Sequence, residues 1–134
     1  MIAVDTSVLI AIFLDEPEAE IFKAVLRRET VIIGWPTLLE TRAVLTGRRF
    51  SNPGEIVMRF SVAPNITAVA FDGEHYRAAE RALERYGKGR HPASLNMGDC
   101  FSYAVAAIAK APLLFKGQDF CQTDLKLHPA SSTA

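Results

Sequence analysis

Four carboxylates that lie far apart in the chain occupy similar places in a repeating pattern. Each sits just beyond a strand-like apolar run; they are Asp5, Glu40, Asp99 and Asp119. In an open parallel sheet the functional crevice lies beyond the carboxyl ends of the strands, so we expect these acids to converge there. Clustered carboxylates raise one another's pKa unless a cation neutralises them. Because oxygen ligands favour Mg²⁺ or Mn²⁺ over zinc, the sequence predicts a divalent metal site suited to phosphate chemistry.

Each acid also has an ordinary interpretation. Asp5 could cap the helix that follows it. Thr37 and Glu40 match the spacing of a capping box. Asp99 is favourable in the first turn of a helix because of the helix dipole, and Asp119 fits a simple turn. All four would then have to fall at the same edge of one sheet by coincidence, whereas a metal site accounts for them together.

The elements that must position these acids alternate between strand and helix. Apolar runs predict strands at residues 2–4, 30–34, 66–70 and 113–115, with a fifth at 125–127. Helical periodicity and capping residues predict intervening helices, including segments at 36–47, 51–63 and 98–110. The pattern indicates an α/β protein with three layers, α/β/α, around a central, mostly parallel sheet of four to five strands. We expect a single domain over residues 1–128 and a disordered tail over 129–134.

Composition limits the classes of partner. The 134 residues carry 15 basic and 15 acidic side chains, so any nucleic-acid binding must come from local segregation of charge. Basic side chains cluster after residue 77, and we expect them, with one lysine near the metal edge, to guide RNA phosphates. A solvated helix face and a polar loop are the alternative for these residues: Arg81, Arg85, Lys88, Arg90, His91 and Lys116.

The cysteines and histidines favour a protein of a reducing compartment. The two cysteines, Cys100 and Cys121, show no CxxC spacing, and the three histidines form no zinc pattern. The first segment is apolar but lacks a basic leader and is interrupted by acids, so it reads as neither a signal peptide nor a membrane span. We expect a cytoplasmic protein with no membrane association. The apolar first helix, with Trp35 and the helix after Asn52, suits a groove for a partner segment or a second copy.

Several segments together resemble a known family. They are DTSVL at 5–9, LET at 39–41, YGKGRH at 86–91, LNMGDC at 95–100 and LFKGQDF at 114–120. Their order and spacing resemble the VapC toxins among the PIN-domain ribonucleases, and the resemblance covers nearly the whole chain. Any single motif would be weak because a short Asp-Thr-Ser after a strand is common.

The resemblance implies a Mg²⁺- or Mn²⁺-dependent endoribonuclease, the toxin of a type II toxin–antitoxin pair, inhibited by a VapB-like antitoxin and tending to form homodimers. Asp5 and Asp99 would bind the metal directly, and Glu40 and Asp119 directly or through water. Asp124 is the alternative to Asp119 for the fourth position. The implied substrate is a single-stranded loop of a structured RNA such as tRNA or rRNA, cut by water to leave 5′-phosphate and 3′-hydroxyl ends. Ser7 and Ser102 could add hydroxyl contacts.

Two other functions compete with this interpretation. A PIN scaffold that has lost catalysis would act only by binding. A receiver-like phosphoacceptor domain has a similar size and an acidic pocket, but receivers carry adjacent acids after the first strand. Here the first strand is followed by Asp5 alone. The sequence leaves open one or two metal ions.

Overall fold

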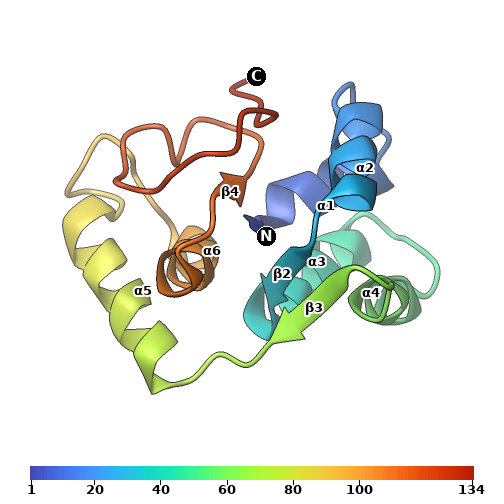
Figure 1. Ribbon diagram of the computed structural model, residues 1–134, viewed down its shortest axis with the longest axis horizontal. Coiled ribbons are helices and arrows are strands. Elements are labelled where there is room, and N and C mark those ends of the chain that lie inside the picture. The colour runs from blue at the N-terminus through green and yellow to red at the C-terminus, as the bar shows by residue number, and fades with distance from the viewer.

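The central feature of the molecule is a parallel four-stranded sheet (Figure 1). A computed structural model describes all residues, 1–134. The strands run in the order β3-β2-β1-β4. Their bounds are β1 (Ile2–Val4), β2 (Val31–Gly34), β3 (Ile66–Val69) and β4 (Leu113–Leu114).

Helices cover both faces of this sheet. One face carries α1 (Thr6–Phe13), α2 (Ala19–Arg28), α3 (Trp35–Gly47) and α4 (Pro53–Ser61), and the other carries α5 (Gly73–Tyr86) and α6 (Met97–Ala109). Figure 1 shows the two groups on opposite sides of the strands. The predicted three-layer α/β/α architecture is therefore confirmed.

The strands divide the apolar core into two parts because successive side chains on a strand point to opposite faces. Ile2 and Val4 of β1 pack with the side chains of α1 to α4, whereas Ala3 packs with those of α5 and α6. In β2, Ile33 and Ile32 divide in the same way. Burial on both faces explains why these strands are continuous apolar runs rather than alternating ones.

The apolar first helix follows β1 directly. Val8, Leu9 and Ala11 of α1 are buried, and Ile10, Ile12 and Phe13 are partly exposed. None of the helices is both long enough and apolar enough to cross a membrane.

The chain end differs from the sequence expectation. Instead of a fifth strand over 125–127, Leu127 makes a single parallel bridge to Leu113. In the segment predicted as a disordered tail, the amide of Ser132 donates to the carbonyl of Phe115 at 3.0 Å, and Ser132 also bridges Lys116. The edge of β4 offers unpaired backbone groups, and the tail satisfies them.

Candidate metal-binding active site

Asp5 occupies the carboxyl end of β1 and starts α1. Its Oδ2 accepts hydrogen bonds from the backbone amide of Ser7 at 3.0 Å and from the Ser7 hydroxyl at 2.7 Å. Its Oδ1 accepts the hydroxyl of Ser102, from α6, at 2.5 Å. The residue as a whole is only 6% exposed. Asp5 is thus both a helix cap and a buried carboxylate fixed by three neutral donors.

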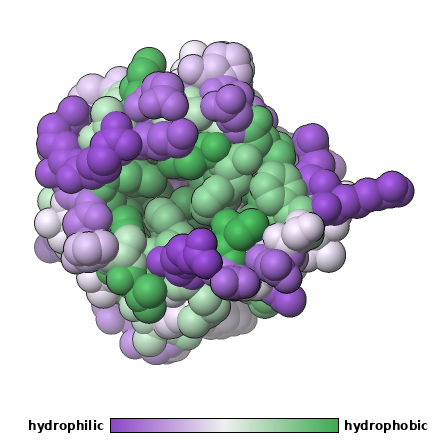
Figure 2. All heavy atoms as spheres, turned by 90° about the vertical axis from the view of Figure 1, so that its right-hand side faces the viewer, coloured by the Kyte–Doolittle hydropathy of each residue, from purple (hydrophilic) through white to green (hydrophobic).

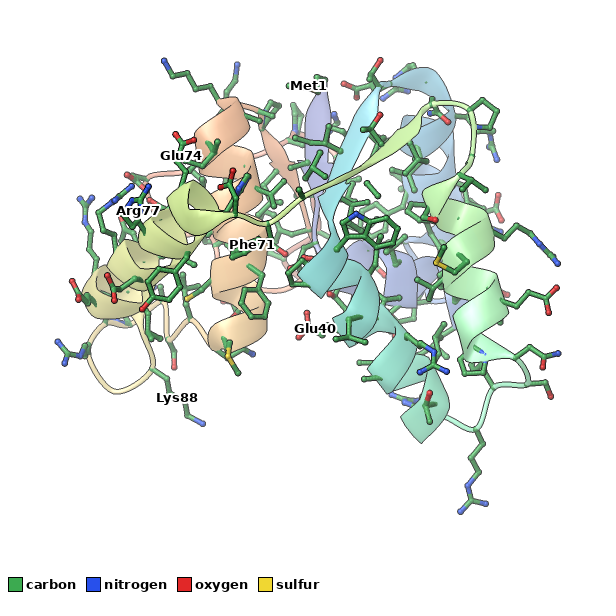
Figure 3. All side chains as sticks on the ribbon, turned by 90° about the horizontal axis from the view of Figure 1, so that it is seen from below. Met1, Glu40, Phe71, Glu74, Arg77 and Lys88 are labelled. Atoms are coloured by element: carbon green, nitrogen blue, oxygen red, sulfur yellow. The ribbon has the colours of Figure 1, made fainter.

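Glu40 reaches the same region from α3. The hydroxyl of Thr6 donates to its Oε1 at 2.6 Å, and Figure 3 shows the side chain lying between α3 and α6. A Cβ atom added to Gly98 would lie 2.0 Å from Glu40 Oε2, so the carboxylate rests directly on the first turn of α6. Burial, and secondarily the charge of Asp5, raises the pKa of Glu40.

Asp99 is placed by the start of α6. Its Oδ2 accepts the amide of Asn96 at 3.0 Å, while Asn96 Oδ1 accepts the amide of Asp99 at 2.8 Å, which forms a reciprocal capping box. The residue is 7% exposed. Burial raises the pKa of Asp99 to about 8, and the charges of Asp5 and Asp119 add to the effect.

The fourth acid is Asp119, in the exposed turn that follows β4. It lies close enough to Asp99 for its carboxylate to help raise the pKa of Asp99. The alternative candidate, Asp124, lies elsewhere: it accepts the hydroxyl of Tyr103 at 2.6 Å and pairs with Arg85 at 3.5 Å. The structure therefore brings Asp119, and not Asp124, to the acidic site.

The four acids converge, but by different routes from the one that the sequence suggests. Asp5 and Asp119 follow strands, whereas Glu40 lies in the second turn of α3 and Asp99 comes from the start of α6. None of the four forms an ion pair with a basic side chain. No three His, Cys, Asp or Glu side chains are grouped closely enough to enclose a metal ion. The result is a largely buried acidic site without a basic partner.

The structure confirms some of the ordinary helix-capping interpretations of the acids and contradicts one of them. Asp5 and Asp99 do cap their helices, so capping and site geometry coexist in both residues. The capping box proposed for Thr37 and Glu40 is wrong because α3 starts earlier, with Gly34 as its N-cap and Pro36 in its first turn. Pro lacks an amide hydrogen and fits the first turn of a helix, where that donor has no partner. Glu40 is thereby left free of a capping role.

Two contributors to the site escape sequence reasoning. The hydroxyl of Thr6 holds the carboxylate of Glu40, 34 residues away in the sequence. Gly98 provides the space that Glu40 fills. In the sequence, these two contributors are marked only by their positions next to Asp5 and Asp99. Neither position predicts that α3 and α6 lie in contact.

The predicted RNA-binding residues separate into two groups. Arg85 pairs with Asp124 and lies 5.0 Å from the centre of the Tyr86 ring. His91 packs edge-on against Tyr86 and accepts the amide of Ala93 at 3.0 Å, so it stabilises the loop. Lys116 is bound to two glutamates. The remaining three are exposed and make no ion pair: Arg81, Lys88 and Arg90. Figure 3 shows Lys88 pointing away from the body of the molecule.

Comparison with known proteins agrees with the fold. The PIN domain family matches residues 2–126. "Ribonuclease VapC" of Mycolicibacterium smegmatis is 44% identical over 125 residues, which cover 91% of this chain and 95% of that protein. "Ribonuclease VapC30" of Mycobacterium tuberculosis is 43% identical, covering 91% and 94%. The chain therefore belongs to the PIN domain family, among the VapC ribonucleases, and the receiver-like alternative is set aside.

Solved structures of low sequence identity share the fold. VapC20 of Mycobacterium tuberculosis, described as a sarcin-ricin loop cleaving toxin, has a TM-score of 0.77 and 17% identity over 93% of this chain and 96% of its own. VapBC2 of Rickettsia felis, solved with a DNA fragment from its promoter, has a TM-score of 0.70 and 15% identity over 96% and 98%.

The raised pKa of Asp99 predicts a pH-dependent stability in the metal-free protein. Folding raises this pKa from its ordinary value to about 8, so between roughly pH 4 and pH 8 the folded state holds a proton that the unfolded state has lost. The free energy of unfolding should therefore fall as pH rises through that window. Asp99→Asn should remove this part of the slope. Urea denaturation of both proteins in EDTA at several pH values measures the difference, and parallel curves would contradict the assignment.

Gly98→Ala should displace the carboxylate of Glu40 without unfolding the protein. The added methyl group would overlap the end of a flexible side chain, and alanine favours the helix by about 1 kcal/mol over glycine. If Glu40 acts in the reaction, activity should fall by up to about a hundredfold while the melting temperature holds or rises. Thermal melts and cleavage rates, compared with Glu40→Gln, test this. Full activity in Gly98→Ala would show that the position of Glu40 is unimportant.

Proposed function

We propose that the protein is a Mg²⁺- or Mn²⁺-dependent endoribonuclease and the toxin component of a type II toxin–antitoxin pair. The observation that carries this proposal is the convergence of four carboxylates without a basic partner at the carboxyl edge of the sheet. The names of the VapC relatives support ribonuclease activity. The alternative is a catalytically inactive scaffold, which the presence of all four acids disfavours.

The donors fit a hard divalent cation. All the candidate ligands are carboxylate oxygens. Burial, and secondarily the charges of Asp5 and Asp119, raises the pKa of Asp99, and a cation beside these carboxylates would offset that effect. Mg²⁺ is commonly held by one or two carboxylates with water completing its shell, so a closed group of three is not required. We assign Asp5 and Asp99 as direct ligands, with Glu40 and Asp119 acting directly or through water.

The chain's own residues would then perform distinct tasks. When bound, the ion supplies a Lewis acid that acidifies water and neutralises charge on the scissile phosphate. Ser7, Ser102 and Asn96 hold the two ligand carboxylates in fixed orientations. Glu40 is suited to accept the proton of the attacking water because its raised pKa brings it nearer to the working pH. Attack by water does not need the 2′-hydroxyl and leaves 5′-phosphate and 3′-hydroxyl ends.

Substrate binding is assigned to the free cations. Arg81, Lys88 and Arg90 are exposed and unpaired, so they can contact RNA phosphates. We propose an accessible loop of a structured RNA, such as tRNA or rRNA, as the target. The relative described as cleaving the sarcin-ricin loop shares the fold and is consistent with this class of substrate.

Incubating the antitoxin-free protein with total cellular RNA tests the proposal. Cleavage at discrete positions should require Mg²⁺ or Mn²⁺, stop in EDTA and fall at least about a hundredfold in Asp99→Asn and Asp5→Asn. Asp124→Asn is the matched control and should retain cleavage because its carboxylate pairs outside the site. Cutting that survives EDTA or Asp99→Asn would indicate a contaminant, and no cutting at all would favour the scaffold.

A second surface suits the antitoxin. An apolar hollow of about 230 Å³ lies between α1, α2 and α4, and Figure 2 shows hydrophobic side chains gathered there within a hydrophilic rim. It is lined by Ile12, Phe13 and Phe60 among others, with Lys23 and Arg27 beside them. We propose that an amphipathic segment of a VapB-like antitoxin lies in this groove. Solved toxin–antitoxin complexes with the same fold support such a partner.

A second, larger hollow of about 680 Å³ lies beside Glu40 and is lined by Trp35, Leu39, Phe71 and Phe101. The remaining assignments of assembly and location rest on the family resemblance. We propose that the protein is a homodimer and works in the cytoplasm.

Truncating the groove should weaken the antitoxin complex. Phe13→Ala removes an aromatic side chain from the lining of the hollow, and such residues commonly contribute more than about 1 kcal/mol to binding, so affinity should fall by about tenfold or more. Ile21→Ala is the control, since Ile21 is 58% exposed on α2 but does not line the groove. Calorimetric titration with the cognate antitoxin measures both. Equal affinities for the two variants would place the antitoxin elsewhere.

A further inference from the structure

Lys116 lies immediately beyond β4, but its ammonium group is directed to acidic residues outside the site. Nζ lies 2.9 Å from Oε1 of Glu16 and 3.0 Å from Oε1 of Glu18, both in the α1–α2 connection. Its side chain is 22% exposed, and that of Glu18 is 13% exposed. Two carboxylates thus neutralise a single cation, which leaves no free positive charge for an RNA phosphate.

The backbone of Lys116 contacts the acidic site. Its amide donates to the hydroxyl of Ser7 at 2.9 Å, and that hydroxyl donates its only proton to Asp5 Oδ2 at 2.7 Å. The direction of this relay is therefore fixed: amide to hydroxyl to carboxylate. Asp119 follows three residues later in the turn that Lys116 begins. The position of Lys116 consequently affects two of the four acids.

The C-terminal segment joins the same group of contacts. The hydroxyl of Ser132 donates to Oε2 of Glu18 at 2.9 Å, and its carbonyl accepts the amide of Gly117 at 2.8 Å. Oε1 of Glu18 is buried and accepts no hydrogen bond, and the ammonium of Lys116, at 3.0 Å, is the cation that pairs with it. Removing the lysine would leave Glu16 and Glu18 to repel each other, so the attachment of the loop and the tail to the end of β4 would weaken.

We propose that Lys116 is a positioning residue of the acidic site and not an RNA contact. Its ammonium holds the α1–α2 connection and the C-terminal segment against the end of β4, and this contact fixes Asp5, through Ser7, and the turn that carries Asp119. The catalytic part of this inference rests on the proposed ribonuclease function. The structural part, the attachment of the tail, does not.

Two substitutions distinguish a positioning role from an RNA contact. An RNA contact predicts that Glu18→Gln and Lys116→Met change RNA affinity in opposite directions, whereas a positioning role predicts that both lower kcat. Glu18→Gln weakens the attachment of Lys116 while leaving the lysine charged. If Lys116 contacted RNA, this change would free it and strengthen RNA binding. A positioning role predicts instead that Glu18→Gln and Lys116→Met both lower kcat by about tenfold or more with KM within about twofold. RNA affinity is measured separately in an Asp99→Asn background with a labelled single-stranded oligonucleotide, and it should stay within twofold.

Hydrogen exchange provides a readout that does not depend on ribonuclease activity. In Lys116→Met the amides of Gly117 and Ser132 should exchange at least tenfold faster than in the unmodified protein, and Lys116→Arg, which keeps the charge, should restore part of the protection. Lys88→Met is the matched control: this exposed lysine should alter RNA affinity but not exchange at Ser132.

Each outcome bears on the proposal. Unchanged exchange in Lys116→Met, or RNA binding that weakens in Lys116→Met and strengthens in Glu18→Gln, would overturn it. If the unmodified protein cleaves no RNA while Lys116→Met still releases the tail, the attachment is supported and the ribonuclease proposal alone fails.

Discussion

Negative charge is concentrated at one edge of the sheet, where burial removes the water that would otherwise solvate it. Asp5 and Asp99 are nearly inaccessible, and no basic side chain reaches either of them. The raised pKa values of Asp99 and Glu40 express this cost. The arrangement is unfavourable for the isolated chain and favourable for binding a cation, since each feature that destabilises the carboxylates would be relieved by one positive ion.

The carboxylates keep their positions through neutral donors. Hydroxyl groups of Thr6, Ser7 and Ser102 and the amide of Asn96 supply geometry without supplying charge. Several of these contacts also cap helices, so the first turns of α1 and α6 both stabilise the fold and hold the site carboxylates in place. A cationic side chain in their place would instead neutralise the acids within the protein itself.

The cations of the chain are directed away from the acidic site. Arg85 pairs with Asp124, and Lys116 pairs with Glu16 and Glu18. These pairs connect distant segments: the first joins α5 to the segment after β4, and the second joins the α1–α2 connection to the end of β4. Balanced overall charge therefore conceals an acidic edge without basic partners, ion pairs that lie outside it, and exposed cations that make no ion pair, among them Arg81, Lys88 and Arg90 of α5 and the loop after it.

The sequence by itself determined the three-layer fold, because buried parallel strands and amphipathic helices leave strong apolar patterns. It also predicted Asp5, Glu40 and Asp99 as site acids, from a spaced set of motifs, and left Asp119 and Asp124 open for the fourth position. Only the tertiary structure decided how they meet. The contact of Glu40 with Thr6 and Gly98 depends on the packing of α3 beside α6, and the choice of Asp119 over Asp124 depends on where the turn after β4 points. Lys116 reads as a free cation in the sequence, yet its charge is satisfied by glutamates 100 and 98 residues earlier in the chain. Local patterns report periodicity and capping, whereas contacts between distant segments follow from the packing of whole elements, which no short stretch of sequence encodes.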